Sequence, residues 1–210
     1  MNAFLAALLI LPLWSKPKSA ETIFKFIEEN KYQKFSKALT KEDLNQKSKD
    51  GSTPLIMAVH FNRLRMAQAL VKKNVDVNAQ DNRGNDALFY ATSNLNFAAT
   101  KLMVENGALL DRTYGKKQET VLFDPVRAGE LKLVKYLVLK NPKMIQVQNS
   151  DGETVLFEAA RYGMPDMADY LLSQGVIIEL KNKKGYTAFD VSKEKKFKET
   201  QQIFQKYLEK

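Results

Sequence analysis

Asp50-Gly51-Ser52-Thr53-Pro54-Leu55 combines a turn signal with the start of a helix. Asp, Gly and Ser are typical turn residues. Thr53 is a good N-cap, since its hydroxyl oxygen can accept a hydrogen bond from a helix amide that has no other partner. Pro54 suits the first helical position because the amide that it lacks would stay unpaired there. This stretch predicts a turn followed by a helix that begins near residue 54.

The same signal recurs along the chain at residues 53, 86, 120, 154 and 187, that is, every 33 or 34 residues. The four later copies are Asp86-Ala87-Leu88, Thr120-Val121-Leu122, Thr154-Val155-Leu156 and Thr187-Ala188-Phe189. About a dozen residues after each of the first four copies comes an apolar helical stripe, followed by Asn74, Gly107, Asn141 or Gly175. Asn and Gly tolerate the left-handed conformation at a helix end. Self-similarity at this period predicts stacked repeats that bury their apolar faces against one another.

The pattern resembles the ankyrin repeat over roughly residues 21–210. The best match is residues 50–55 with Ala58, closing at Val77-Asn78-Ala79, and residues 152–154 with Ala159-Ala160 match nearly as well. The resemblance implies an all-α solenoid of stacked helix–turn–helix units with β-hairpin tips. We expect about four central repeats between two capping units, with bounds near 21–47 (cap), 48–80, 81–113, 114–148, 149–181 and 182–210 (cap).

Unit 114–148 departs most from the family pattern. Gln118 replaces its turn glycine, residues 114–117 lengthen its hairpin, and Asn141-Pro142 ends its second helix abruptly. Pro125 falls inside its first helix, where a missing amide is expected to kink or shorten that helix. Irregularity in a repeat array often marks a contact point. In place of the family's histidine after Thr-Pro-Leu, four units carry a residue that we expect to form a core ladder: Ile56, Phe89, Phe123 and Phe157.

The composition argues against catalysis. The 210 residues include no cysteine and one histidine, with 44% apolar residues for a packed core. This excludes disulfides, thiolate nucleophiles and multi-histidine zinc sites. The sequence also lacks a glycine-rich phosphate loop and the alternating acids of a calcium loop. His60 could act as a base, but no spacing supplies a nucleophile and an orienting acid. We predict no enzyme, no cofactor and no metal site.

The formal charge of +9 is concentrated at the C-terminal end. Residues 181–210 hold nine Lys against four acids, whereas residues 51–180 hold fifteen Lys and Arg against fourteen acids. A nearly neutral body is unlike the basic face that follows a phosphate backbone, so nucleic acid is not the expected partner. We interpret the C-terminal lysines as a solvated capping face. An acidic partner, an anionic surface or nucleic acid at Lys193 to Lys198 is the alternative.

Residues 3–13 form an apolar run followed by a polar segment that ends at Ala20. Eleven apolar residues are too few for a transmembrane helix, which needs about twenty. The run is typical of an export signal, although no Lys or Arg precedes it and Lys18 lies close to the cleavage position. We predict export, to the periplasm or beyond, with removal of residues 1–20. Alternatively, these residues form a capping helix and the chain is cytoplasmic.

The ankyrin resemblance implies binding through hairpin tips and the exposed face of each first helix. We transfer these binding positions to the residues that have the same place in each repeat of this sequence. The predicted partner-binding residues are then His60, Phe61, Arg83, Asn94, Lys116, Lys117, Arg127, Asp151, Arg161, Tyr162 and Lys183. Arg and Tyr are enriched at binding hot spots, so Arg127, Arg161 and Tyr162 form the centre of this prediction. The alternative is that these three side chains are only solvated or packed within the groove.

The chain as a whole resembles small exported ankyrin proteins of bacteria, some of which protect their own cell by capping cell-wall peptidases. The resemblance implies a non-catalytic inhibitor or immunity protein. We expect one protein partner in the concave groove, with an acidic rim that complements the groove's Arg and Lys residues, and a monomer or heterodimer. The alternatives are an intracellular scaffold or secreted effector, and a binder of anionic surfaces or nucleic acid.

Overall fold

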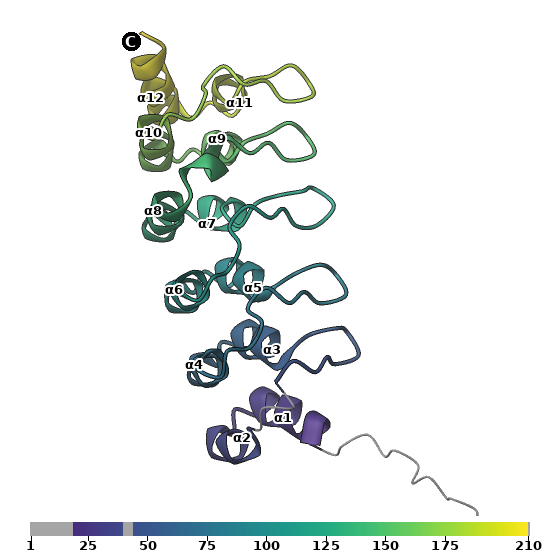
Figure 1. Ribbon diagram of the computed structural model, residues 1–210. Helices are drawn as coiled ribbons and strands as arrows, with labels where there is room; N and C mark the ends of the chain where they lie inside the picture. The colour runs from purple at the N-terminus through teal and green to yellow at the C-terminus, as the bar shows by residue number, and fades with distance from the viewer. Residues whose placement is uncertain (1–18, 40–43, 210) are drawn as a thin grey trace, which may run out of the picture.

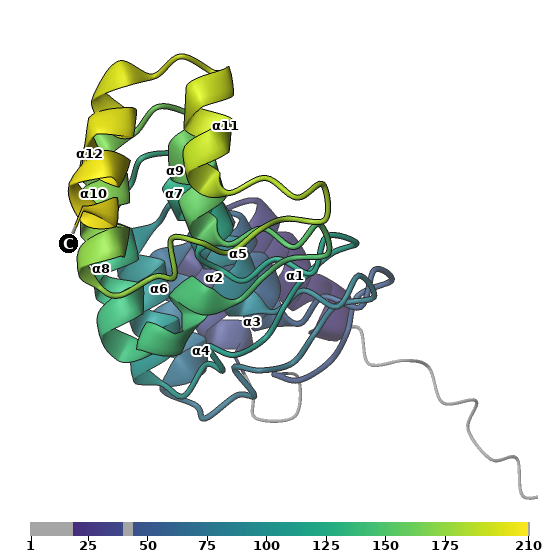
Figure 2. The same cartoon turned by 90° about the horizontal axis from the view of Figure 1, so that it is seen from above.

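The computed structural model describes residues 19–39 and 44–209. Over these residues the chain forms twelve α-helices and one 3-10 helix, arranged as six consecutive helix pairs. The pairs stack in one direction from α1–α2 to α11–α12, and the loops between pairs project to one side (Figure 1). Seen from above, successive pairs are rotated relative to one another, so the stack winds as a shallow superhelix (Figure 2). This confirms the predicted solenoid.

The first helix of each pair lies on the loop side of the stack and the second on the opposite side (Figure 1). The first helices are α1 (Ser19–Glu28), α3 (Pro54–His60), α5 (Ala87–Ser93), α7 (Phe123–Arg127), α9 (Val155–Arg161) and α11 (Ala188–Glu194). The second helices are α2 (Tyr32–Ala38), α4 (Leu64–Val71), α6 (Phe97–Glu105), α8 (Leu131–Lys140), α10 (Pro165–Ser173) and α12 (Lys198–Leu208), with the 3-10 helix η2 (Pro142–Gln146) after α8.

The export prediction falls mainly on residues 1–18, which lie outside the described residues. Residues 19 and 20 form the start of α1. Among the helices that the structure describes, none combines the length and the apolar character that a bilayer span requires.

The helix-start residues act largely as predicted. The Thr53 hydroxyl accepts a hydrogen bond from the Ile56 amide at 3.2 Å, and Asp86 does the same for the Phe89 amide at 2.9 Å. Thr187 and Asp190 form a reciprocal capping box at the start of α11. Thr154 and Thr120 are the exceptions. The buried hydroxyl of Thr154 has no hydrogen-bond partner among the described residues, and α7 begins after Leu122 without a side-chain cap. The prediction of a threonine cap is therefore wrong for α9 and α7.

Unit 114–148 is irregular, as the sequence indicates. Its first helix, α7, has five residues, whereas α3, α5, α9 and α11 have seven each. Residues 121 and 122 form a turn where the other units are already helical, three residues before Pro125. Gln118 adopts φ 52° in place of the glycine that takes a positive φ at this position in the other units. The unit therefore keeps the repeat's plan with a shortened first helix.

The predicted left-handed helix ends hold for three of four residues. Asn74, Gly107 and Gly175 have φ of 58°, 87° and 85°. Asn141 instead has φ −147° and ψ 90°, so this prediction is wrong. The physical reason is Pro142, because the residue before a proline is forced into extended conformations.

The hairpin tips lack the predicted β-strands in the described residues. Each tip is closed by a backbone hydrogen bond such as Asp81 N–H to Asn85 O at 2.9 Å, with a second bond inside the turn, and two tips contain an isolated β-bridge. A five-residue turn leaves too few residues for a ladder of paired strands. In unit 114–148 the closing bond runs from Tyr114 N–H to Glu119 O, one residue longer than elsewhere, which confirms the lengthened hairpin.

Neighbouring tips are joined by backbone hydrogen bonds at three of the four positions where two tips meet. The bonds are Asn82 N–H to Asp50 O, Ser150 N–H to Lys117 O and Lys183 N–H to Asp151 O, at 2.7 to 2.9 Å. Among the described residues no such bond joins tip 81–85 to tip 114–119. The loops of these two units are also visibly further apart in Figure 1. The row of tips is therefore interrupted at this one place.

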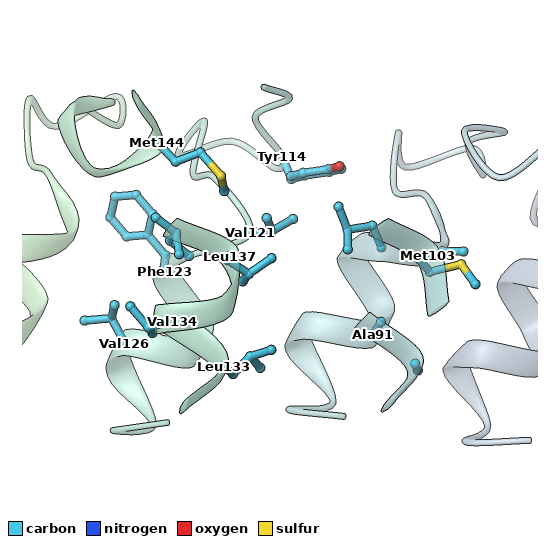
Figure 3. Close-up of a cluster of buried hydrophobic side chains, with 14 of the residues drawn as sticks. Ala91, Met103, Tyr114, Val121, Phe123, Val126, Leu133, Val134, Leu137 and Met144 are labelled. Atoms are coloured by element: carbon cyan, nitrogen blue, oxygen red, sulfur yellow. The ribbon is translucent and has the colours of Figure 1, made fainter. Parts of the chain in front are cut away.

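The core runs the length of the stack between the two rows of helices. Ile56, Phe123 and Phe157 are each 1% exposed and form the predicted ladder, whereas Phe89 is only half-buried. Ala58 and Ala91 are fully buried, which lets the paired helices approach closely. Figure 3 shows the middle of this core, where Phe123 and Val126 of α7 lie among Leu133, Val134 and Leu137 of α8.

Candidate functional site

A pocket of about 570 Å³ opens between the hairpin tips and the first helices of the C-terminal half. Its walls come from the tips of three consecutive units and from the ends of α7 and α9. We call it the charged pocket, because nine of its eleven lining residues are Lys, Arg, Asp or Glu: Lys117, Glu119, Arg127, Asp151, Glu153, Glu158, Arg161, Lys183 and Lys184. The other two are Tyr162 and Asn182.

Arg127 lies at the floor of the charged pocket, in the last turn of α7. Its guanidinium contacts three carboxylates: Glu158 at 3.2 Å, Asp124 at 3.1 Å and Glu119. Two of these belong to its own unit, and Glu158 belongs to α9 of the next unit. The side chain of Glu158 is only 4% exposed, so this contact is a partly buried ion pair between units.

Arg161 occupies the same position one repeat later, in the last turn of α9. It donates to both carboxylate oxygens of Glu153, at 2.7 and 2.8 Å, and to the second oxygen of Glu158. Glu153 in turn accepts a hydrogen bond at 3.0 Å from Asn182 of the last unit. The ion pairs form one continuous network across two units, which we call the ion-pair ladder: Glu119, Asp124, Arg127, Glu153, Glu158 and Arg161. Asn182 attaches this network to the last unit.

The ladder keeps both arginines charged. Burial lowers the pKa of Arg127, but the hydrogen bond to Glu119 and the charge of Glu158 raise it by more, so its pKa lies above the ordinary value. Arg161 is shifted in the same direction, with Glu153 and Glu158 outweighing burial. Hydrogen bonds to the charged forms stabilise them, as expected for paired guanidinium groups.

The charge balance of the ladder differs from the sequence-based expectation. Arg127 and Arg161 were expected to offer positive charge to an acidic partner, but four carboxylates surround these two guanidiniums. With two positive and four negative side chains, the ladder has a formal net charge of −2. Positive charge toward solvent comes instead from the tips, where Lys117, Lys183 and Lys184 are exposed. Lys117 is 3.8 Å from Asp151, with both side chains more than half exposed.

Six of the eleven predicted partner-binding residues lie together in the charged pocket: Lys117, Arg127, Asp151, Arg161, Tyr162 and Lys183. Tyr162 is 51% exposed and offers the largest accessible aromatic surface in this pocket. Lys116 faces a second pocket of about 310 Å³ on the other side of the same tip. Arg83 is exposed at the tip of unit 81–113.

The remaining predicted residues lie in the N-terminal half, away from the charged pocket. The His60 ring contacts Phe61 and Tyr90 edge-on, at centroid distances of 5.1 and 4.7 Å. Asn94 has a structural role, because its side-chain amide donates to the carbonyls of Val59 and His60 at 3.3 and 3.0 Å. Aromatic rings surround His60, so its setting is that of a contact surface.

The aromatic contacts continue into the next two units. Tyr90 contacts Phe89 at 5.4 Å, and Phe89 contacts Tyr114 at 5.1 Å. The Tyr90 hydroxyl donates to Asp81 at 2.6 Å, which fixes the ring. We call this connected series the aromatic strip: Phe61, His60, Tyr90, Phe89 and Tyr114.

Sequence reasoning missed the four acids of the ladder. Their signal was present, because Glu119 and Glu153, then Asp124 and Glu158, recur with the same 34-residue spacing as Arg127 and Arg161. A residue type that repeats at the period of the array projects to equivalent places on neighbouring units. The two arginines were assessed without these partners.

The basic excess of the last unit is partly neutralised within the chain. Lys193 pairs with Asp190 and Lys206 pairs with Asp169, each at 2.8 Å. Lys195, Lys196 and Lys198 are exposed around the start of α12. This arrangement is that of a solvated cap with local ion pairs.

Stacked helix pairs with projecting loops and a lined concave face define a repeat solenoid of the protein-interaction class. A family signature described as ankyrin repeats in three copies matches residues 21–114 and 122–202. The chain therefore belongs to the ankyrin-repeat family, a protein-interaction fold that is generally non-catalytic.

Similar solved structures extend over most of the chain. One is the complex of the predatory endopeptidase Bd0816 from Bdellovibrio bacteriovorus with the immunity protein Bd3460, with 31% identity, a TM-score of 0.81 and coverage of 90% of this chain and 99% of the matched chain. Two further structures share the fold. The ankyrin repeat protein EF0377 has 23% identity and a TM-score of 0.80, with coverage of 90% of this chain and 98% of the matched chain. An ankyrin repeat domain from Acinetobacter baumannii has 22% identity and a TM-score of 0.82, with coverage of 88% and 96% of the two chains.

Relatives found by sequence are much longer than this chain. The transient receptor potential cation channel subfamily A member 1 homolog of Caenorhabditis elegans is 34% identical over 125 residues, which is 60% of this chain and 10% of that protein. The BRCA1-associated RING domain protein 1 of the same organism is 30% identical over 105 residues, or 50% and 15% of the two lengths. These matches cover a small part of each relative.

Proposed function

We propose that this protein is exported and inhibits one partner enzyme, a peptidase of the cell wall, which it holds in its concave face to protect the producing cell. The observation that carries the proposal is the likeness to the structure of an immunity protein in complex with an endopeptidase, at 31% identity over nearly the whole of both chains. The apolar run at residues 3–13 supports the export part of the proposal.

The charged pocket is the proposed centre of the interface. Its volume of about 570 Å³ suits a loop or a few side chains of a partner. The ion-pair ladder holds Arg127 and Arg161 in fixed orientations, so little side-chain entropy is lost when a partner contacts the N–H groups that face the pocket. Tyr162 adds exposed aromatic area, and the tip lysines supply attraction to an acidic rim.

The test is co-purification of the tagged chain with proteins of an envelope extract at low salt. We expect one stoichiometric partner, and we expect its peptidase activity on purified cell wall to fall as the array is added. The double variant Tyr162→Ala, Lys183→Glu changes two exposed pocket residues and should abolish recovery of the partner. Lys73→Glu, an exposed residue just after α4, is the matched charge control and should not. Recovery of no stoichiometric partner would overturn the proposal.

Export is tested separately by N-terminal sequencing of the protein from its native cells. A chain that begins near Glu21 supports export, with α1 then retained from its third residue onward. An intact start at Met1 or Asn2 would favour the intracellular scaffold instead.

A further inference from the structure

The interruption in the row of hairpin tips lies between units 81–113 and 114–148. On either side of it the tips are closely packed: a Cβ added at Gly51 would collide with Asn82, and one at Gly152 would lie 3.1 Å from the backbone nitrogen of Lys183. At Gly84, the equivalent residue before the interruption, nothing lies within 4 Å. The missing tip-to-tip hydrogen bond and this open space are independent signs of the same gap.

The cause of the gap lies in the sequence of unit 114–148. Its tip has one extra residue, and Gln118 stands where the other tips have glycine. Because α7 begins at Phe123, residues 121 and 122 form a turn where the other units have begun their first helix. Both changes alter the backbone that would otherwise pack against tip 81–85.

A pocket of about 310 Å³ lies beneath this gap. We call it the apolar pocket, since its walls include Phe89, Tyr114, Val121 and Phe123. Phe89 and Tyr114 contact each other at 5.1 Å and connect the pocket to the aromatic strip. The full set of lining residues is Phe89, Thr92, Tyr114, Gly115, Lys116, Lys117, Glu119, Thr120, Val121, Phe123 and Asp124.

The polar groups deep in the apolar pocket already have partners. The Thr92 hydroxyl donates to the backbone of α5, and the Tyr114 hydroxyl donates to Asp86 at 2.8 Å. Asp124 accepts hydrogen bonds from Ser93 at 2.6 Å and from Arg127 at 3.1 Å. These three groups therefore offer an occupant no free polar partner, and an apolar side chain is the occupant that the aromatic and aliphatic walls favour.

Two exposed cations flank the gap. Arg83 lies at the tip before the gap and Lys116 at the tip after it. Neither side chain makes an ion pair within the described residues. Lys116 lines the pocket, so a carboxylate at its mouth would be attracted by this charge.

We propose that the apolar pocket binds one large apolar side chain, best an aromatic one, from a partner segment that carries a carboxylate directly beside it. This inference rests on the proposed function for the existence of a protein partner. It adds the chemistry of one contact with that partner. Aromatic rings stack edge-on or offset against the rings of Phe89 and Tyr114, which adds to the gain from burial. The pocket thus selects an acidic–aromatic pair.

The test uses indole-3-propionate as the probe, followed by chemical-shift changes of the ¹⁵N-labelled full chain. We expect shifts at the amides of Gly115, Val121 and Thr92. The neutral indole-3-propionamide should bind several-fold more weakly, and propionate, which lacks the ring, should not bind measurably. Shifts that fall elsewhere on the chain, or equal binding of the acid and the amide, would overturn the proposal.

Variants separate the two parts of the contact. Phe89→Ala removes an aromatic wall and should weaken the probe about tenfold, or roughly 1.4 kcal/mol. Phe97→Ala removes an aromatic ring of similar exposure that packs against Tyr136 on the outer helices, and should leave the affinity unchanged. Lys116→Glu costs no packing and should weaken the acid but not the amide. Lys73→Glu, outside both pockets, is its charge control.

The outcomes distinguish this inference from the proposed function. If a partner co-purifies with the chain and its affinity is unchanged by Lys116→Glu and Phe89→Ala, the pocket proposal is wrong and the function stands. If the probe binds as described but no partner is recovered, the pocket proposal stands and the function is wrong.

Discussion

The two halves of the concave face use the same repeat positions for opposite chemistry. In units 48–80 and 81–113 the face is lined by rings that touch one another, from Phe61 to Tyr90. In units 114–148 and 149–181 it is lined by the ion-pair ladder. Both halves have the same backbone plan, with first helices capped by a hairpin tip.

The comparison is clear when equivalent positions are aligned. The tip position holds Ser52, Asn85, Glu119 and Glu153 in successive units. The position five residues later holds Met57, Tyr90, Asp124 and Glu158, and the last residue of each first helix is His60, Ser93, Arg127 or Arg161. The fold accepts both sets, so it does not require the charged one. Partly buried ion pairs add little net stability over apolar packing. The two halves therefore differ in what they present at these positions: one carries no acidic or Arg side chain there, and the other carries four carboxylates and two guanidiniums.

The largest expected effect comes from breaking the ladder at its most buried member. Glu158→Ala leaves Arg127 and Arg161 without a shared carboxylate, and we expect a loss of about 3 kcal/mol in the free energy of unfolding. This loss is at the low end of the range expected when one partner of a buried ion pair is removed, because both arginines remain partly exposed to solvent. Urea unfolding measures the effect.

Met57→Ala, at the equivalent position of the aromatic half, is the control for this experiment. Met57 is half-buried and takes part in no ion pair, so we expect a clearly smaller loss in the free energy of unfolding. Equal losses in the two variants would contradict the distinction between the halves.

The second prediction breaks the aromatic half. Tyr90→Ala removes the ring between His60 and Phe89 together with the hydrogen bond to Asp81. For a half-buried aromatic residue we expect a loss of about 2 kcal/mol, below the cost at a fully buried site. Thermal and urea unfolding both report it. A loss below about 0.5 kcal/mol is typical of ordinary surface substitutions and would show that the aromatic strip does not stabilise the fold.

The third prediction concerns alkaline pH. Burial, followed by the hydrogen bond to Asp81, raises the pKa of Tyr90 above its ordinary value of 10.0. Below pH 10 this residue's stabilisation of about 1 kcal/mol is fully present, and it is lost as the pH rises through the folded-state pKa. Tyr90→Phe lacks the hydroxyl, so the stability difference between the two proteins should shrink above pH 10. A difference that grows with pH would have the wrong sign.

The smallest effect is expected at the rim of the charged half. Lys117→Ala removes an exposed ion pair with Asp151 at 3.8 Å. Such pairs contribute at most about 0.5 kcal/mol, so the unfolding midpoint should hardly change. A loss comparable to that of Glu158→Ala would mean that the tip lysines, and not the ladder, hold this half together.

Most of the fold followed from the 33- to 34-residue period, because turn and cap residues act locally. The short α7 was foreseen from Pro125, and the core ladder from Phe123 and Phe157. The conformation of Asn141 was missed because a local rule for helix ends was overruled by the following proline. The unpaired hydroxyl of Thr154 was missed because capping depends on rotamer and packing, which the residue type does not determine.

The candidate site was only partly predictable. The position of each residue within its repeat correctly grouped Arg127, Arg161 and Tyr162, because equivalent positions of neighbouring repeats lie on the same face. The pairing of the arginines could not follow from single positions, since it depends on carboxylates eight residues away and one unit further along. The apolar pocket arises from a missing contact between two tips, and sequence patterns give no direct sign of a missing contact.

The way the tips are joined has an evolutionary consequence. At Lys117 and Asp151 the hydrogen bonds to the next tip are accepted by main-chain carbonyls, so these two side chains are not needed for those bonds. Substitutions at these side chains therefore leave stability almost untouched and are open to selection for a new partner. An array built in this way can follow a changing target through its tips while its helices stay constant.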